Sequence, residues 1–468
     1  MSYIRIRKHY IHIPHLVLGV IEFCCHFAVV WLLDTVLVAK VEPAITLATQ
    51  WPIYLIYALL LSCSTLAMGV YNALLSESAT NMLLRTLVSY FLIAMLGFVA
   101  IRLIFPAFVP GQLVLFWSII SSLVATVLIR IVFGATFDMR RLRRKVLIYG
   151  AGKKAVDIVE ALGEEGFHDV ELFGCVKSNG HDGLVDESLL LDEPENWSRF
   201  LKKNKISEVV IAQDERRKSE GGGVPLNQLL FAKLQGVDIT EVASFIERGQ
   251  NKLELPLLET SWMLFSDGFK YSKSRDYGKR LFDLIVSFLL FLVVAPLMIP
   301  TALAVFLETG RPIFYHQERV GYNGRRFRIY KFRSMRQDAE KGGKAVWAKK
   351  NDSRVTKVGA FIRNTRLDEL PQLLNVIRGE MSFVGPRPER PEFVDELSKK
   401  IPYYDLRHTV KPGLMGWAQL KYPYGASEED AKNKLEYDLY YTKNHSLMMD
   451  VLIMIQTVEV VLLGKGVH

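Results

Sequence analysis

The stretch TRLDELPQLLNVIRGEMSFVGPRP, residues 365–388, carries the strongest chemical signal in this 468-residue chain. Two adjacent carboxylates, Asp368 and Glu369, stand just ahead of Pro371. Because proline is tolerated in the first turn of a helix, we expect a helix to begin near Asp368. Its buried face is predicted at the i, i+3, i+4, i+7 positions Leu370, Leu373, Leu374 and Ile377. Two carboxylates at a helix start, followed by a Pro-Arg-Pro bend, indicate a phosphate-handling site.

Composition indicates a membrane protein with soluble parts. Half of the residues (50%) are hydrophobic, the net charge is +9, and the mean hydropathy is +0.17. A chain this long suits about three domains. Its basic residues concentrate at membrane flanks and phosphate motifs and not on a separate patch, which argues against a nucleic-acid partner. The four cysteines lack metal-ligand spacing, so neither a disulfide framework nor a zinc site is indicated.

Apolar runs fill the first third of the chain, at 16–38, 51–70, 86–104 and 112–133. Each is near the ~20 residues that a spanning helix needs, which predicts a four-helix transmembrane unit over 1–139. Lysines and arginines precede the first run and follow the fourth, so the positive-inside rule places both ends of this unit in the cytoplasm. Glu22 and His26 share one face of the first run. They indicate either an interhelical polar contact or part of a functional pathway.

A Rossmann-like nucleotide-binding-type domain is predicted over 140–246, followed by a polar linker at 247–277. The segment VLIYGAGKKA, residues 146–155, reads as a strand, a glycine turn and a helix start. Gly150 and Gly152 would permit close approach of a phosphate, so they are the candidate cofactor-binding residues. No acidic residue ends the second strand, which argues against dinucleotide redox chemistry. A regulatory nucleotide site and a structural or dimerising domain both stay open.

A re-entrant helix is predicted over 281–308, at the start of a catalytic domain that covers 278–468. Lys279 and Arg280 precede its apolar run, and many basic residues follow between 311 and 336. Both ends therefore prefer the cytoplasmic face. Pro296, near the middle of the run, would bend the helix so that it enters one leaflet and returns. The alternative, a kinked fifth span, would place the following domain outside the cell. The apolar segment 447–463 is expected to lie at the membrane interface.

Phosphoryl transfer needs a nucleophile, cations and often a divalent metal ion. Asp368 or Glu369 can attack phosphorus, and the neighbouring carboxylate can bind Mg²⁺. A predicted strand around 327–332 displays the first two of several cations that could bind phosphate: Lys331, Arg333, Arg354, Arg363 and Arg387. In isolation, such a carboxylate pair is more often a helix cap and a surface ion-pair partner. Residues 337–351 are expected to form a flexible flap.

Residues 279–468 resemble the bacterial sugar transferase family, the monotopic phosphoglycosyl transferases. The motifs that carry the resemblance are KRLFD at 279–283, QERVG at 317–321, KFRSM at 331–335, LDELPQ at 367–372, VGPRP at 384–388, KPG at 411–413 and GWAQ at 416–419. The whole chain is similar to the large members called polyprenyl glycosylphosphotransferases. Segments 422–427 and 440–445 resemble the subgroup encoded with exosortase-type exopolysaccharide systems.

The resemblance implies a two-step reaction at the cytoplasmic face of a bacterial inner membrane. Asp368 would attack a UDP-sugar and release UMP, and undecaprenyl phosphate would then accept the phosphosugar. Asp368 and Glu369 would hold Mg²⁺. The residues expected to bind substrate phosphates are Lys331, Pro386 and Arg387, with Arg333, Arg319 and Arg354 as further candidates.

Glucose-1-phosphate is the expected group transferred, with galactose-1-phosphate or an N-acetylated sugar as alternatives, and a homodimer is open. The family's break is often Ser-Pro, whereas this chain has Ala295-Pro296. Residues 421–425, KYPYG, stand where small members carry Asn-Gly-Arg, which leaves the donor-sugar contacts undefined. A non-catalytic membrane scaffold is the alternative function. The retained Asp368, Glu369 and Arg387 argue against that alternative.

Overall fold

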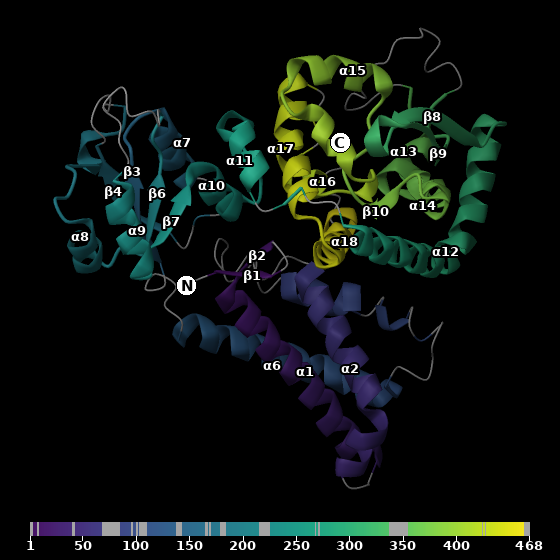
Figure 1. Ribbon diagram of the computed structural model, residues 1–468. Coiled ribbons are helices and arrows are strands. Elements are labelled where there is room, and N and C mark those ends of the chain that lie inside the picture. The colour runs from purple at the N-terminus through teal and green to yellow at the C-terminus, as the bar shows by residue number, and fades with distance from the viewer. Residues whose placement is uncertain are drawn as a thin grey trace. The chain divides into compact units, whose positions relative to one another are not determined.

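The computed structural model describes residues 3–6, 9–39, 43–67, 85–94, 97–99, 102, 110–136, 143–163, 167, 170–177, 184–214, 225–266, 268–269, 272–336, 354–423, 425 and 427–462. The chain divides into two compact units, residues 1–4 with 133–266 and residues 5–132 with 267–468. The protein is mixed α/β, with a parallel sheet in the first unit and apolar helices in the second (Figure 1).

The first unit is built on a five-stranded parallel sheet in the order β5-β4-β3-β6-β7. Its strands are β3 (Arg144–Tyr149), β4 (Val170–Val176), β5 (Leu190–Leu191), β6 (Glu208–Ile211) and β7 (Asp238–Glu241). From β3, the next two strands in the chain are added on one side of the sheet, and β6 and β7 are added on the other side. Ligands of open α/β sheets bind at such a switch point, here between β3 and β6. The strand and helix start expected within 146–155 are therefore confirmed as β3 and the helix that begins at Lys153.

Helices cover both faces of this sheet, because alternate residues of a strand point to opposite sides. Val146 and Ile148 of β3 pack with α7 (Lys153–Leu162) and α10 (Val242–Gln250). Leu147 and Tyr149 pack with α8 (Trp197–Asn204) and α9 (Leu226–Leu234). Figure 1 shows this three-layer arrangement. The described part of this unit also contains two short 3₁₀ segments, Glu187–Leu189 and Leu255–Leu257, and the helix α11 (Thr260–Phe265).

The N-terminal part is largely helical. A two-stranded sheet of β1 (Tyr3–Ile6) and β2 (His9–His12) precedes it. Its helices are α1 (Ile13–Asp34) with a π-helical continuation (Thr35–Ala39), α2 (Pro43–Ala67), a π-helical turn (Ser89–Ala94) and α6 (Gln112–Thr136). Among the described residues, two helices are long and apolar enough to cross a membrane, Leu16–Leu37 and Gln112–Phe133, or three if a bent pair counts as one span. These helices indicate a membrane protein. The third predicted span, 86–104, lies partly outside the described residues.

Glu22 and His26 make interhelical polar contacts, one of the two interpretations that their spacing left open. The guanidinium of Arg130 donates to both carboxylate oxygens of Glu22, at 2.6 and 2.9 Å, and both side chains are buried. The hydroxyl of Tyr90 lies 3.3 Å from Nε2 of His26. A charged pair inside an apolar bundle avoids the cost of an unpaired buried charge.

The C-terminal part begins with α12 (Lys273–Thr309), which bends by 62° between Lys273–Leu292 and Val294–Thr309. Pro296 explains the position of the bend, because it has no N–H to donate to the carbonyl of Leu292. The predicted break is confirmed. Length and composition are compatible with a broken span as well as with a re-entrant helix.

Charged residues of the KRLFD motif anchor α12 to the rest of this part. Lys279 forms a 2.6 Å ion pair with the buried Asp450 of α18 (Leu447–Leu462). Arg280 donates to the last carbonyls of α14 (Leu373–Arg378), those of Val376 and Ile377. Asp283 accepts from the amide of Phe383, at 3.1 Å, in β10 (Ser382–Val384). The motif therefore fixes this helix against the elements that lead into and out of the segment with the two carboxylates and the Pro-Arg-Pro bend.

The remaining elements surround an antiparallel hairpin of β8 (Phe314–Val320) and β9 (Arg326–Phe332) and a parallel pair of β10 and β11 (Gly413–Met415). They are a 3₁₀ turn (Tyr322–Gly324), α13 (Lys357–Asn364), η8 (Leu367–Gln372), α15 (Pro391–Lys400), η9 (Tyr404–Thr409), α16 (Trp417–Lys421) and α17 (Glu428–Asn444). The strand expected around 327–332 is confirmed as β9. The expected flap, 337–351, lies outside the described residues.

The helix expected near Asp368 has a different buried face from the predicted one. It starts as the 3₁₀ helix η8 and becomes α-helical only at Leu373. Because a 3₁₀ helix has 3.0 residues per turn, the phase of the apolar positions shifts where the two segments join. Leu373 and Val376 are buried, whereas Leu374 and Ile377 are 45% and 41% exposed. The predicted Leu370, Leu373, Leu374 and Ile377 face is therefore wrong in part.

Candidate active site

The two carboxylates lie in the first turn of η8, which packs against β9. Arg366 adopts a left-handed conformation (φ 58°) just before this turn and directs the chain into it. Asp368 is buried, with 7% of its surface exposed. The turn places both acidic side chains next to Lys331, which comes from the adjacent strand β9.

Glu369 is held by two cations. Its Oε1 lies 2.8 Å from Nζ of Lys331 and 3.4 Å from Nη2 of Arg387. Burial alone would raise the pKa of Glu369, but Lys331, Arg387 and Arg366 together hold it well below its usual range. Burial lowers the pKa of Lys331, and the charge of Glu369 partly offsets this. Glu369 is therefore a fixed anion and Lys331 a cation held beside it.

Asp368 has a different environment. Among the described residues, no hydrogen bond or ion pair reaches its carboxylate. Burial raises the pKa of Asp368, opposed by the charge of Lys331 and reinforced by that of Glu369. The pKa values of the two adjacent carboxylates are thus shifted in opposite directions, that of Asp368 upward and that of Glu369 downward. In many active sites such a difference gives two carboxylates separate chemical roles. Asp368 is the poorly solvated carboxylate with its oxygens uncommitted, which suits a nucleophile.

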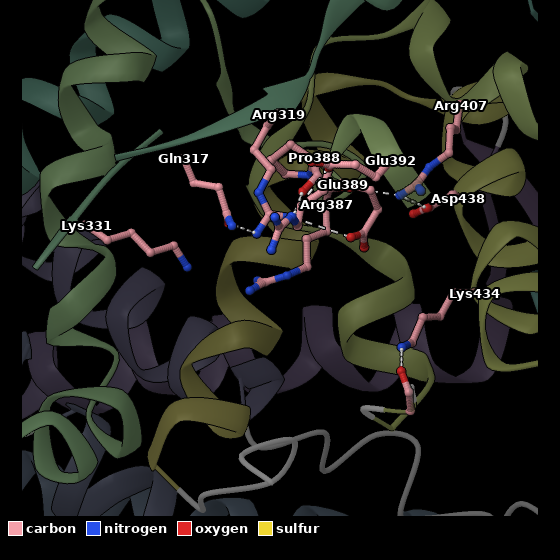
Figure 2. Close-up of polar contacts among 12 residues, drawn as sticks. Gln317, Arg319, Lys331, Arg387, Pro388, Glu389, Glu392, Arg407, Lys434 and Asp438 are labelled. Carbon is pink, nitrogen blue, oxygen red and sulfur yellow. Dashed lines mark hydrogen bonds and ion pairs between the residues drawn. The ribbon is translucent and has the colours of Figure 1, made fainter. Parts of the chain in front are cut away.

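The bend at Pro386, Arg387 and Pro388 brings a second cation to the carboxylates. The segment follows β10, and its amide at Gly385 donates to Met415 of β11 at 2.9 Å. A side chain at Gly385 would lie 2.2 Å from the carbonyl of Lys411, so the close approach of these two chains requires glycine. In Figure 2 the side chains of Arg387 and Lys331 extend toward a common region. Both cations pair with Glu369, which the figure does not label.

The other predicted phosphate-binding residues take varied positions. Within the described part of the chain, the buried Nη1 of Arg333 has no hydrogen-bond partner. Arg319 donates to the carbonyl of Pro388 at 3.1 Å and to Gln317 at 2.6 Å, so it supports the Pro-Arg-Pro bend (Figure 2). Arg354 precedes α13 and its carbonyl accepts from the amide of Arg336. Of the predicted cations, Lys331 and Arg387 thus pair with Glu369, whereas Arg319 binds the backbone of the Pro-Arg-Pro bend.

Sequence reasoning passed over Arg407 and Asp438. Arg407 of η9 is buried, forms a 2.8 Å ion pair with Asp438 of α17, and donates to the carbonyl of Arg387 at 2.8 Å. A signal was present, because Asp438 lies in a helix between the buried residues Leu435 and Leu439. A charge inside an apolar helical face calls for a buried partner.

The donor set fits a magnesium ion. Two carboxylates with substrate phosphate oxygens are the ligands that Mg²⁺ prefers in phosphoryl-transfer sites. Asp368 has uncommitted oxygens and Glu369 is anionic. Among the described residues, no group of three or more His, Cys, Asp or Glu side chains gathers as a complete protein-only metal site. Substrate oxygens would therefore have to complete the coordination.

The glycine turn of the other unit contains an acidic side chain. Asp214, which follows β6, accepts hydrogen bonds from the backbone amides of Lys153 and Lys154 at 2.7 and 3.0 Å. A side chain at Gly152 would lie 2.1 Å from the Asp214 carboxylate, and one at Gly150, where φ is +122°, 2.5 Å from the carbonyl of Ala212. These contacts to the end of β6 account for both glycines.

Comparisons with known proteins identify the family. The family described as bacterial sugar transferase matches residues 274–464. A UDP-N-acetylgalactosamine-undecaprenyl-phosphate N-acetylgalactosaminephosphotransferase of Aeromonas hydrophila is 47% identical over 188 residues, which cover 40% of this chain and 44% of that protein. An undecaprenyl-phosphate glucose phosphotransferase of Komagataeibacter xylinus is 32% identical over 329 residues, 68% of this chain and 59% of that protein.

An uncharacterized sugar transferase of Haemophilus influenzae extends the match further, with 30% identity over 352 residues, 69% of this chain and 70% of that protein. The chain belongs to the bacterial sugar transferase family. The match spans less than two thirds of the length of the Aeromonas and Komagataeibacter relatives.

Proposed function

We propose that this protein transfers a sugar-1-phosphate from a UDP-sugar to undecaprenyl phosphate and so begins assembly of an exopolysaccharide or capsule. The observation that carries the proposal is the unequal carboxylate pair. Asp368 is buried without a described partner, beside an anionic Glu369 that shares one oxygen between Lys331 and Arg387. A nucleophile and fixed cations within one small site are what phosphoryl transfer requires.

In the first step, a carboxylate oxygen of Asp368 attacks the sugar-bearing phosphorus of the donor. The bond from that phosphorus to the bridging oxygen breaks, UMP leaves with the electron pair, and a phosphosugar remains on Asp368. Lys331, Arg333 and Arg387 bind phosphate oxygens, with Pro386 shaping the bend that presents Arg387. Preorganised cations lower the barrier because they face the charge that develops on these oxygens.

In the second step, a phosphate oxygen of undecaprenyl phosphate attacks the phosphosugar. The aspartyl–phosphorus bond breaks, which regenerates the Asp368 carboxylate and yields a diphosphate-linked lipid sugar. Asp368 and Glu369 would hold Mg²⁺, which supplies charge neutralisation of phosphate oxygens when bound. Glu369 keeps Lys331 and Arg387 within reach of those oxygens.

The membrane arrangement belongs to the same proposal. A four-helix unit would anchor the chain in a bacterial inner membrane, and α12 would enter the cytoplasmic leaflet and return at its 62° bend. This geometry keeps the catalytic residues on the cytoplasmic face, where UDP-sugars and the phosphate of the lipid acceptor meet. Cysteine labels at Tyr277 and Gly310 should then both react from the cytoplasmic side. Labelling from opposite sides would establish a fifth span.

The donor sugar is proposed as glucose, with N-acetylgalactosamine as the second choice. The Komagataeibacter relative is named for glucose and the Aeromonas relative for N-acetylgalactosamine. Purified protein incubated with undecaprenyl phosphate, Mg²⁺ and a panel of UDP-sugars should release UMP with one donor. Absence of UMP with every donor would contradict an enzymatic role and favour a scaffold in polysaccharide assembly.

A further inference from the structure

The segment that presents Arg387 has no regular secondary structure beyond Val384, yet five of the six carbonyl groups from Val384 to Glu389 accept hydrogen bonds. The donors are Tyr441 Oη to Val384 at 3.0 Å, Gly413 N to Pro386 at 3.0 Å, Arg407 Nη2 to Arg387 at 2.8 Å, Arg319 Nη1 to Pro388 at 3.1 Å and Val320 N to Glu389 at 3.0 Å. A network of satisfied carbonyl groups restrains the backbone of such a loop.

The bond from Arg407 to the carbonyl of Arg387 is the one nearest in sequence to the proposed phosphate-binding side chain. Arg407 donates to the residue whose own side chain reaches Glu369, and Arg407 itself is buried, with 6% exposure. The side chain of Arg387 is 34% exposed, and its Nη2 lies 3.4 Å from the Glu369 carboxylate. Figure 2 shows Arg407 on the opposite side of this segment from Lys331. Arg407 therefore contacts the backbone of Arg387 on the side away from Lys331, and the side chain of Arg387 stays directed toward Glu369.

The charge of Arg407 is balanced by Asp438, at 2.8 Å, and its Nη1 donates to the hydroxyl of Tyr404 at 2.7 Å. The helix that carries Asp438 starts at a capping box of Ser427 and Asp430, which fixes its beginning. A buried arginine whose fork is engaged on a carboxylate and a carbonyl has little freedom to move.

We propose that Arg407, held by Asp438, is a positioning residue that fixes Arg387 for phosphate binding in the proposed transfer reaction. This inference rests on the proposed function. It identifies residues outside the motif that carries Arg387, and it explains why a buried ion pair lies behind an otherwise irregular loop. Neither Arg407 nor Asp438 touches the substrate in this account, since both act through the backbone of Arg387.

The test compares Arg407→Gln with Arg407→Lys and with a control in a buried ion pair of the other unit, Glu208→Gln, whose carboxylate pairs with Arg144 and Arg248. In full-length protein we expect Arg407→Gln to slow the first-step burst of UMP by about 100-fold, because small displacements of a positioned group have effects of that order. Arg407→Lys should recover part of the rate, and Glu208→Gln should leave the burst of folded protein unchanged.

A double-mutant cycle separates positioning from general loss of structure. If Arg407 acts through Arg387, then Arg407→Gln should slow the burst much less in an Arg387→Gln background than in the wild type. The same fold-loss in both backgrounds would overturn the proposal.

A second measurement does not depend on activity. Hydrogen exchange of peptides that cover 384–390 should be faster in Arg407→Gln than in the wild type and in Glu208→Gln. Unchanged exchange would contradict the positioning role. If the wild type releases no UMP but exchange rises as expected, the proposed function fails while the support of this loop by Arg407 stands.

Discussion

The glycine turn at Gly150–Gly152 and the carboxylate pair at Asp368–Glu369 are both expected phosphate sites, and their surroundings differ. At the glycine turn, the helix-terminal amides of Lys153 and Lys154 already donate to the carboxylate of Asp214. At the carboxylate pair, positive charge from Lys331 and Arg387 converges on one oxygen of Glu369. Both regions contain a carboxylate. At the glycine turn Asp214 accepts from the backbone amides that a phosphate would need, whereas at the carboxylate pair two side-chain cations gather beside Glu369, where a phosphate can approach them. Local motifs indicate where phosphate fits, and tertiary contacts decide whether the position is occupied.

The largest effect is expected from Asp368→Asn. Removal of a nucleophile from an active site costs at least about 10⁴-fold in rate. We expect UMP release and the covalent phosphosugar adduct, followed by mass spectrometry, to disappear together. Glu369→Gln, the matched neighbour, should slow the reaction while still allowing the adduct to form. An adduct on Asp368→Asn protein would show that another residue is the nucleophile.

The second largest loss of activity is expected from Lys331→Ala. Loss of one preorganised charge that faces the reacting oxygens costs about 10²–10³-fold in kcat. The same change frees Glu369 from its 2.8 Å partner, so the pKa of Glu369 should rise toward its usual range. Lys399→Ala, an exposed lysine of α15, serves as the control for charge alone. Equal rates for the two variants would remove Lys331 from the mechanism.

At the glycine turn, by contrast, we expect neither phosphate binding nor a role in the transfer reaction. In the wild-type protein, we expect that NAD, NADP, ATP and UDP do not raise the unfolding temperature of the first unit. The reason is that Asp214 already accepts hydrogen bonds from the amides that a phosphate would need. Asp214→Ala should leave transferase activity unchanged and lower the stability of this unit by about 1 kcal/mol, as for a lost helix cap. Saturable nucleotide binding that Gly152→Ala abolishes would instead establish a regulatory site there.

The smallest effect concerns the pH dependence of stability at Asp438. Burial raises the pKa of Asp438 to about 6, opposed by Arg407 and Lys434 and reinforced by Glu389. The folded protein thus holds this proton more tightly than the unfolded chain does. The stabilising contribution is complete below the unfolded value of 3.8 and is lost as pH rises through about 6. The thermal midpoint of the wild type, measured against that of Asp438→Asn, should fall over this window. A constant difference between the two proteins would contradict the raised pKa.

Much of the architecture follows from local pattern. The first strand of the parallel sheet, the bend of α12 near Pro296 and the strand that carries Lys331 were predicted from local pattern and proline chemistry. The buried face of the helix after Asp368 was partly wrong, because a 3₁₀ turn shifted its phase. Arg407 and Asp438 could not be linked to Arg387 from sequence, since they lie 20 and 51 residues away along the chain.

By itself, the sequence determined the helices long and apolar enough to cross a membrane, the parallel sheet and the adjacent acidic pair, because each depends on spacing along a few turns or strands. Only the tertiary structure decided that Asp214 occupies the glycine turn, 61 residues from the amide of Lys153. It also decided that Asp368 and Glu369 have unequal environments and that Arg319 and Arg407 hold the backbone around Arg387. The physical reason is that hydrogen bonds and burial depend on which distant segments meet, and no local periodicity encodes that meeting.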